Sequence, residues 1–273
     1  GRTCAGGSKQ RQYVPREEAA SPTVGLEAFF ATLIIDAHED RDVQTFDVPG
    51  AFLQTPMPPH KKVILKFEGR FVDIMCEVNP EFIPDIQYEN GKKVLYVLVT
   101  RAIYGLVESA LLWYELYTST LKDMGFVLNP YDKCIANKII NGKQCTIAWY
   151  VDDNKVSHVD ATVNTQVVDE IESRFFGELT RTTGKKHVFL GMTIEFIGNG
   201  KVAITTPQHI DEALEDFGET INESVVNPAK SKLFQVNTVS PRLDHNRSDK
   251  FHSISAKLLW VCKRSRPDVE TAV

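Results

Sequence analysis

Two adjacent acidic residues, Asp152 and Asp153, end an apolar run of the sequence and are the first candidates for chemistry. The run Cys145–Val151 leads into Asp152-Asp153-Asn154, and an apolar-leaning segment, 155–159, follows. Asp and Asn favour turns because their side chains bond nearby backbone groups and tolerate left-handed conformations. The pattern predicts a hairpin with two carboxylates at its tip, where oxygen ligands can hold a divalent cation. A solvated acidic loop is the alternative interpretation.

A third carboxylate, Asp47, lies near the end of another predicted strand. Residues 43–48 alternate as in a strand, and Pro49-Gly50 must end the ladder, because Pro lacks the donor and Gly permits a turn. A lone Asp there is costly to bury unless it is paired or binds a metal. If the strands are neighbours, three carboxylates meet at one end of a sheet and stay ionised only with cations present. Two Mg²⁺ roughly 3.5–4 Å apart form the clamp used for in-line nucleotidyl transfer.

Helices and strands alternate along the rest of the chain. Apolar residues at helical spacing predict helices over 22–37, 103–124 and 160–176, one opened by Thr206-Pro207, and a last one carrying Phe251 to Val261. Strands are predicted over 63–67, 94–100, 133–140, 143–151, 188–197 and 201–205. The turns Asn141-Gly142 and Gly198-Asn199-Gly200 predict two hairpins. The pattern indicates an α+β fold with a substantially antiparallel sheet and helices on one face.

Composition sets only broad limits on function. The 273 residues carry a net charge of −5 with a pI near 5.8, which neither supports nor excludes a nucleic-acid partner, because basic residues still cluster locally. Five scattered cysteines without a CxxC pair argue against a disulfide framework or a zinc site and indicate a reducing compartment. No apolar run is long enough to span a bilayer. The first residue is Gly and the last pattern stops at Val273, so we expect a fragment of a longer chain.

Five short motifs resemble those of the reverse transcriptase domain of copia-type (pseudoviral) LTR retrotransposons, and the resemblance covers nearly the whole chain. Their order and spacing make it specific. The matching segments are F-D-V-P-G-A-F-L at 46–53 (family D-V-x-x-A-F-L), A-I-Y-G-L at 102–106 with Trp113 (L-Y-G-L…W), Y-V-D-D at 150–153, F-L-G-M at 189–192 (F-L-G-[IM]) and R-S-R-P-D at 264–268 (T-R-P-D).

The resemblance implies a polymerase right-hand fold, with an antiparallel palm sheet backed by helices, partial fingers and a small helical thumb. Residues 1–45 and 53–105 would be mainly fingers, and 46–52 and 106–205 mainly palm. Residues 206–250 would be thumb-like, and 251–273 would start the connection to a missing RNase H.

The implied activity is RNA-directed DNA synthesis, in which a primer is extended with dNTPs. Asp47 and Asp152 would bind two Mg²⁺, with Mn²⁺ as an alternative ion, the Val48 carbonyl as a further ligand and Asp153 as a third, more structural carboxylate. The implied dNTP-binding residues are Gly50, Ala51, Phe52, Tyr104 and Gly105, with Phe52 as the steric gate against ribonucleotides. The implied primer grip is Phe189, Leu190, Gly191 and Met192. Lys185 or Lys186 could donate to the leaving pyrophosphate.

The implied partners are an RNA or DNA template with its primer, dNTPs, and the RNase H and integrase of a pol polyprotein, without a membrane. The implied location is the cytoplasm, within a virus-like particle, or the nucleus. Two segments depart from the family: V-E-S-A-L at 107–111 replaces K-Q-x-P-R, and Asn154 replaces an apolar residue. They leave open a catalytically decayed remnant that only binds nucleic acid. A nucleotide cyclase, which shares a palm-like acid pair, is a third alternative.

Overall fold

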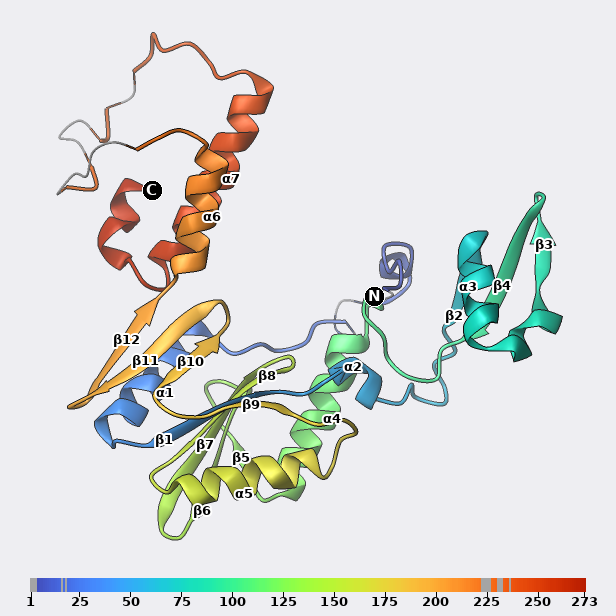
Figure 1. Cartoon of the computed structure of the whole chain (residues 1–273), viewed down its shortest axis with the longest axis horizontal. Coiled ribbons are helices and arrows are strands. Elements are labelled where there is room, and N and C mark those ends of the chain that lie inside the picture. Colours follow the sequence, from blue (N-terminus) through green and yellow to red (C-terminus); the bar gives the residue numbers. More distant parts are fainter. Residues whose placement is uncertain (1–3, 16, 18, 222–226, 230–232, 236) are drawn as a thin grey trace.

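The structure is a computed structural model that describes residues 4–15, 17, 19–221, 227–229, 233–235 and 237–273. Its strands form one six-stranded and two three-stranded sheets, and every strand pair in them is antiparallel. Helices pack against these sheets (Figure 1). The predicted α+β class with antiparallel sheets is therefore confirmed. No helix in these described ranges is long and apolar enough to cross a membrane.

The six-stranded sheet is the centre of the molecule, with the strand order β5-β6-β7-β8-β1-β9. Asn141 and Gly142, with φ of 51° and 73°, form the predicted tight turn between β6 and β7. The strands are β1 (Asp42–Asp47), β5 (Val127–Leu128), β6 (Ile135–Ile140), β7 (Lys143–Tyr150), β8 (Asp153–His158) and β9 (Thr180–Thr182).

Helices cover both faces of this sheet, not one as predicted. On one face lie α4 (Ser109–Asp123) and α5 (Ala161–Glu172), where Trp149 of β7 packs 5.5 Å from the Tyr117 ring of α4. On the other face lies α1 (Leu26–His38), whose Asp36 pairs with the Lys155 ammonium of β8. Side chains alternate along a strand, so the polar Lys155 could reach α1 only from the face opposite Trp149.

A three-stranded sheet and two helices continue the chain beside α1. The sheet contains β10 (Lys186–Phe189), β11 (Met192–Gly198) and β12 (Lys201–Thr205), and the helices are α6 (Pro207–Phe217) and α7 (His245–Cys262). Phe189 stacks on Phe29 of α1 with ring centroids 4.5 Å apart. His187 Nδ1 lies 3.2 Å from the Thr45 hydroxyl of β1. The small sheet is thus fixed both to α1 and to the central strand.

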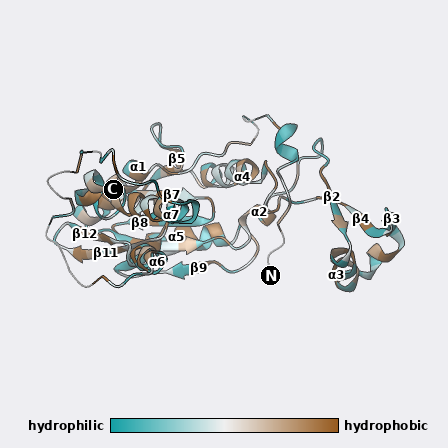
Figure 2. Cartoon of the chain, turned by 90° about the horizontal axis from the view of Figure 1, so that it is seen from above, coloured by the Kyte–Doolittle hydropathy of each residue, from teal (hydrophilic) through white to brown (hydrophobic). Residues whose placement is uncertain are grey.

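The third sheet stands apart at one end of the molecule (Figure 2). It contains β2 (Ile64–Glu68), β3 (Gln87–Glu89) and β4 (Lys92–Leu98), packed against α3 (Arg70–Val78) and a 3-10 turn, Pro80–Asp85. Two chain segments connect it to the rest: Met57 N donates to Thr100 O, Ala102 N donates to Thr55 O, both at 2.9 Å, and Pro56 bridges Arg101. We call these segments, 55–57 and 100–102, the neck. Short 3-10 turns also occur at Gln10–Gln12 and Pro267–Ala272.

Three predicted boundaries differ from the structure. The first helix begins at Leu26 and not at Ser21-Pro22, because Gly25 is extended and donates its N–H to Asp132 Oδ2 at 2.7 Å. The helix predicted from residue 103 begins at Ser109, since Gly105 has a φ of +91°. The strand predicted over 188–197 is two strands, because Leu190 and Gly191 turn the chain with φ of 50° and 72°.

Candidate active site at the end of the central sheet

Two of the predicted carboxylates are direct neighbours across two strands. Asp47, the last residue of β1, pairs with Asp153, the first residue of β8, and Asp153 in turn pairs with Tyr150 of β7. Cross-strand partners place their side chains on the same face of a sheet, here the face that carries Lys155 and α1. Asp152 occupies the turn immediately before Asp153. The predicted meeting of three acidic residues at one sheet end is therefore found in the backbone.

The turn between β7 and β8 is held by three hydrogen bonds. Val151 has a φ of +57°, a conformation that is strained for a β-branched residue. Its carbonyl accepts from the buried Trp113 indole, Nε1 to O 2.7 Å. The Asp152 carbonyl accepts from Asn154 Nδ2 at 2.6 Å and from Val48 N at 3.2 Å. Because surrounding groups hold strained residues in place, these bonds explain how Asp152 keeps a fixed position next to β1.

The three carboxylates influence one another electrostatically. Burial, followed by the charges of Asp152 and Asp47, raises the pKa of the Asp153 carboxyl to about 6. Within the described ranges, no group of three or more His, Cys, Asp or Glu side chains is arranged so that it could hold a metal ion. The donor set nevertheless suits a hard divalent cation, because a cation offsets the burial and the neighbouring negative charges that raise the pKa of Asp153. The side chains would have to turn toward one another to ligate it.

The predicted nucleotide-binding residues lie beside Asp152. Gly50, with a φ of 58°, starts the short helix α2 (Ala51–Gln54) directly after β1. Phe52 of α2 packs on Tyr104, with ring centroids 4.6 Å apart, and the Tyr104 hydroxyl donates to Asp152 Oδ2 at 3.3 Å. Tyr104 therefore links the aromatic ring of the predicted gate to a predicted catalytic carboxylate. Ala51 is fully buried, backbone included.

The predicted primer-grip residues divide into two kinds. Phe189 and Met192 are buried in the core, so their side chains cannot contact a primer directly. Leu190, which is half-buried, and Gly191, which is exposed, form the turn between them. A β-carbon on Gly191 would approach His209 to 3.0 Å and Trp260 to 3.3 Å. The turn is thus seated against α6 and α7, where His209 and Trp260 stack at 3.6 Å.

Two sequence hypotheses about charged residues are changed by the structure. Lys185 lies 3.4 Å from Asp40, at the opposite end of β1 from Asp47, so it does not face the carboxylates. Lys186 starts β10 with an exposed side chain. Glu108 is buried and accepts from Gln10 Nε2 at 2.6 Å. It therefore does not present its charge where the family has basic residues.

The sequence did not reveal the charged residues behind the site. Lys155 and Asp36, each with side chains only 1% exposed, form an ion pair between β8 and α1. His187 joins β10 to Thr45, two residues before Asp47, and burial lowers its pKa. Lys155 lies two positions after Asp153 in β8, which puts both side chains on the same face of the sheet, but the strand is polar at most positions, so its sequence does not show that Lys155 is buried. Its partner, 119 positions away, has no local signal.

The raised pKa of Asp153 gives a prediction for stability without metal. The folded pKa of about 6 exceeds the ordinary value near 3.9, so between about pH 4 and 6 the folded state holds more protons and stability falls as pH rises. Asp153→Asn removes this loss. The difference in thermal midpoint between the variant and wild type is therefore expected to increase from pH 4 to pH 7. Each kcal/mol of unfolding free energy that wild type loses corresponds to about 2–4 °C. Parallel pH curves would contradict it, and the exposed Asp123→Asn is the matched control.

Comparison with known proteins adds a family to this geometry. Residues 1–231 match the family described as reverse transcriptase (RNA-dependent DNA polymerase). A putative transposon Ty5-1 protein of Saccharomyces cerevisiae is 25% identical over 227 residues, which are 83% of this chain and 66% of that protein. A retrovirus-related Pol polyprotein from transposon TNT 1-94 of Nicotiana tabacum is 22% identical over 273 residues, covering 98% of this chain and 19% of that protein. The chain thus spans only part of each relative.

Solved structures show weaker likeness. The match to a foamy viral protease-reverse transcriptase in complex with double-stranded DNA covers 80% of this chain and 27% of that chain. The two are 14% identical, with a TM-score of 0.40. The match to an apo telomerase from Candida tropicalis covers 66% of this chain and 40% of that chain. The two are 13% identical, with a TM-score of 0.37.

Proposed function

Because this chain belongs to the copia type of the reverse transcriptase (RNA-dependent DNA polymerase) family, we propose that it extends a primer with dNTPs by metal-assisted nucleotidyl transfer. The family accounts for the α+β architecture as a polymerase right-hand fold. One observation carries the proposed chemistry: β1 and β8 pair in the register that sets Asp47 opposite Asp153, with Asp152 in the adjoining turn.

The carboxylates of Asp47, Asp152 and Asp153 would hold two Mg²⁺. When bound, the ions lower the pKa of the attacking primer hydroxyl and neutralise charge on the leaving pyrophosphate. The chain's own contribution is positioning. Val48, Trp113 and Asn154 fix the turn through its carbonyls, and Tyr104 orients the Asp152 carboxylate. Such fixed placement lowers the barrier because reacting groups need not be ordered during the reaction.

The division of the chain into subdomains is part of the proposal. The central sheet with α4 and α5 would be the palm, the sheet of β2, β3 and β4 the fingers, and α6 with α7 the thumb-like part. The proposed partners are an RNA or DNA template with its primer, dNTPs, and the remaining domains of a Pol polyprotein. The turn Leu190-Gly191 would contact the primer strand through its backbone, since its buried neighbours cannot.

Primer extension by the purified chain tests the proposal. Poly(rA) with an oligo(dT) primer, dTTP and Mg²⁺ is expected to give labelled product, and omission of Mg²⁺ is expected to remove it. A decayed remnant that only binds nucleic acid would bind the primer-template and give no product. Burial of Glu108, whose carboxylate accepts a hydrogen bond from Gln10, weakens one argument for that remnant.

Phe52 provides a prediction about sugar selection. The residue is 9% exposed and its ring lies against Tyr104 near Asp152, where it would collide with a 2′-hydroxyl. Phe52→Ala is expected to reduce discrimination against ribonucleotides by about 10–200-fold, the range for a small steric difference in a pocket. The ratio of kcat/KM for dTTP and UTP measures it.

A matched control separates the gate from a loss of packing. Phe126→Ala also removes a buried aromatic residue, 2% exposed, but Phe126 directly precedes β5, away from the carboxylates. This control is expected to lose stability and keep the wild-type sugar ratio. An unchanged ratio in Phe52→Ala, with primer extension intact, would remove the gate role.

A further inference from the structure

His187 is a buried titratable residue that the proposed chemistry does not use. It is only 1% exposed, and it lies where the chain leaves the central sheet for the small sheet. β9 belongs to the central sheet, with Thr182 opposite Thr45 of β1. β10 begins shortly afterwards, at Lys186, and is the first strand of the small sheet. His187 therefore occupies the corner between the two sheets.

Two hydrogen bonds define the state of the His187 imidazole. Its Nε2 lies 2.9 Å from the Gly184 carbonyl, which can only accept, so Nε2 carries a proton. Burial lowers the pKa of the ring, so at neutral pH Nδ1 is unprotonated and is an acceptor. The Thr45 hydroxyl, 3.2 Å away, is therefore the donor to Nδ1. The ring thus joins the turn before β10 to the central strand β1.

Thr45 connects this bond to the predicted metal ligands. It lies two residues before Asp47 in β1, so the two side chains are on the same face of the sheet. In the pairing of β1 with β8, Asp47 is opposite Asp153 and Thr45 is opposite Lys155. The strand that carries Asp47 is therefore held by the His187 ring one row behind the carboxylates.

On its other side the ring belongs to the strand that leads into the Leu190-Gly191 turn. His187 and Phe189 are the two buried residues of β10, and the turn follows Phe189 directly. The stacking of Phe189 on α1 is an apolar contact, which is non-directional and tolerates small shifts of the strand. A hydrogen bond requires a set distance and angle. The bond from Thr45 therefore fixes where β10 lies relative to β1.

Further contacts connect the turn with the strand end next to the carboxylates. A β-carbon on Gly191 would lie 3.3 Å from Trp260, and the Arg264 guanidinium lies 4.0 Å from the centre of that indole. Burial lowers the pKa of Arg264, and Tyr150 partly offsets this, so Arg264 lies near Tyr150. Tyr150 is the cross-strand partner of Asp153. The turn and the carboxylates are thus joined through α7 as well as through β10.

We propose that His187 is a positioning residue for nucleotidyl transfer. Through Thr45 it fixes the place of the Leu190-Gly191 turn, and with it the primer end, relative to Asp47. The inference rests on the proposed function, in which the turn contacts the primer and Asp47 binds metal. His187 acts through alignment and is not itself a catalytic group. A displacement of about 1 Å between reacting groups can lower a rate about a hundredfold, so one directional bond at this corner affects the chemical step.

Thr45→Val and Thr45→Ser test the bond from β1. Valine has the shape of threonine without the hydroxyl, whereas serine keeps the donor. Single-turnover primer extension at saturating dNTP is expected to be about 10–100-fold slower in Thr45→Val, and Thr45→Ser is expected to restore most of the rate. The Kd of the primer-template, measured by fluorescence anisotropy, is expected to stay unchanged, because phosphate contacts supply much of that affinity. A wild-type rate in Thr45→Val would overturn the inference.

His187→Gln and His187→Asn separate the two bonds of the ring. Glutamine can place its amide nitrogen where Nε2 donates to Gly184, and asparagine can place its amide oxygen where Nδ1 accepts from Thr45. His187→Gln is therefore expected to be as slow as Thr45→Val, and His187→Asn to be faster. The double variant Thr45→Val with His187→Gln is expected to be no slower than either single variant, because both break the same bond. Equal rates for the Gln and Asn variants, or additive losses, would contradict the inference.

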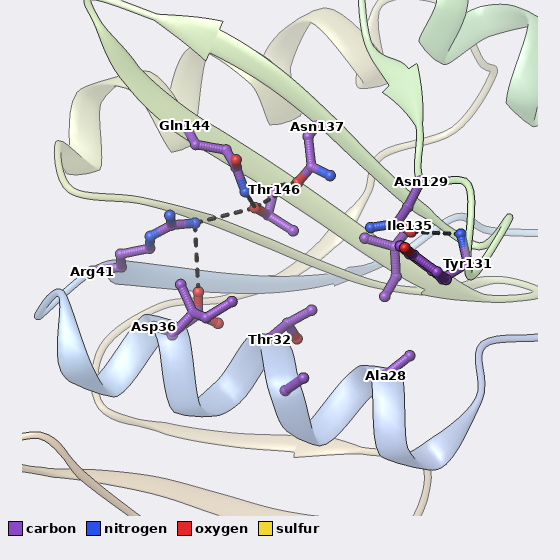
Figure 3. A pocket seen from close by; sticks show the side chains of 12 residues that line it. Ala28, Thr32, Asp36, Arg41, Asn129, Tyr131, Ile135, Asn137, Gln144 and Thr146 are labelled. Carbon is purple, nitrogen blue, oxygen red and sulfur yellow. Dashed lines mark hydrogen bonds and ion pairs between the residues drawn. The ribbon is translucent and has the colours of Figure 1, made fainter.

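Thr146→Val is the matched control for a general loss of packing. Thr146 is 4% exposed and Thr45 is 7% exposed, and both face the α1 side of the central sheet. Figure 3 shows that the Thr146 hydroxyl is bonded to Arg41 and Asn137, and neither belongs to β10. The control is expected to lower the thermal midpoint and keep the wild-type extension rate. A rate loss equal to that of Thr45→Val would refute the positioning role.

The same assay separates this inference from the proposed function. Product from wild type, with unchanged rates in Thr45→Val and His187→Gln, would overturn the inference alone. If wild type gives no product, the proposed function fails, and the inference fails with it because there is no reaction to align.

Discussion

Asp152→Asn is expected to lower the rate of primer extension by at least about a thousandfold. Asp152 occupies the turn that Val48, Trp113 and Asn154 hold against β1, so the variant keeps the geometry and loses one negative charge. A metal ion contributes several kcal/mol to the stabilisation of a transition state, and each 1.36 kcal/mol is tenfold in rate. Single-turnover extension of a labelled primer with saturating dNTP measures the chemical step.

The matched control is Asp123→Asn, which makes the same chemical change at an exposed position near the end of α4. It is expected to extend the primer at the wild-type rate. The thermal midpoint of Asp152→Asn without metal is expected to equal or exceed that of wild type, because the variant removes one of the two charges that, after burial, raise the Asp153 pKa. A wild-type extension rate for Asp152→Asn would overturn the assignment of the site.

Lys155→Met is expected to lower the free energy of unfolding by about 3 kcal/mol. The Lys155 ammonium and the Asp36 carboxylate are almost completely buried, and removing one member of such a pair costs roughly 3–5 kcal/mol because the other charge stays uncompensated. The lower value applies here, since Arg41 remains 3.9 Å from Asp36. Urea unfolding of both proteins, followed by tryptophan fluorescence, gives the difference.

The double variant Asp36→Leu with Lys155→Met separates charge from packing. It removes both buried charges and leaves Arg41 paired with Glu39 at 2.8 Å. Replacing a buried pair by apolar residues is often neutral, so the double variant is expected to recover most of the loss. A double variant that is less stable than Lys155→Met would show that the ion pair stabilises the fold by more than its desolvation costs.

The sequence correctly predicted turns and strand ends that depend on the residues within them. Asn141-Gly142 could only be a tight turn, and the strand ending at Asp47 followed from the Pro and Gly behind it. The predicted start of the first helix was wrong. Ser21-Pro22 is a valid start signal, but Gly25 is held extended by a hydrogen bond to Asp132, a partner too distant in sequence to be predicted. In the same way, the predicted helix start at residue 103 failed because the left-handed Gly105 lies against the backbone of Ala5, where a β-carbon would be 2.0 Å from its oxygen.

The candidate site was predicted as a set of residues but not as a network. The carboxylates could be placed together because a strand end and a hairpin tip have recognisable sequences. The hydrogen bond from Tyr104 to Asp152 and the pair of Lys155 with Asp36 join residues 48 and 119 positions apart. Sequence spacing predicts contacts only between residues that are close in the chain, so it could not predict these two. The roles of the site residues in binding metal, dNTP and primer stay predictions.

The neck at 55–57 and 100–102 has a consequence for how the molecule moves and unfolds. The sheet of β2, β3 and β4 packs on its own helix and is joined to the rest by two segments with few backbone hydrogen bonds. Regions linked in this way open as separate cooperative units with lower free energy than the core. Amide protons of β2 and β4 will therefore exchange with solvent as one group, sooner than those of β7 and β8. Opening of this sheet at the neck would leave the central sheet intact.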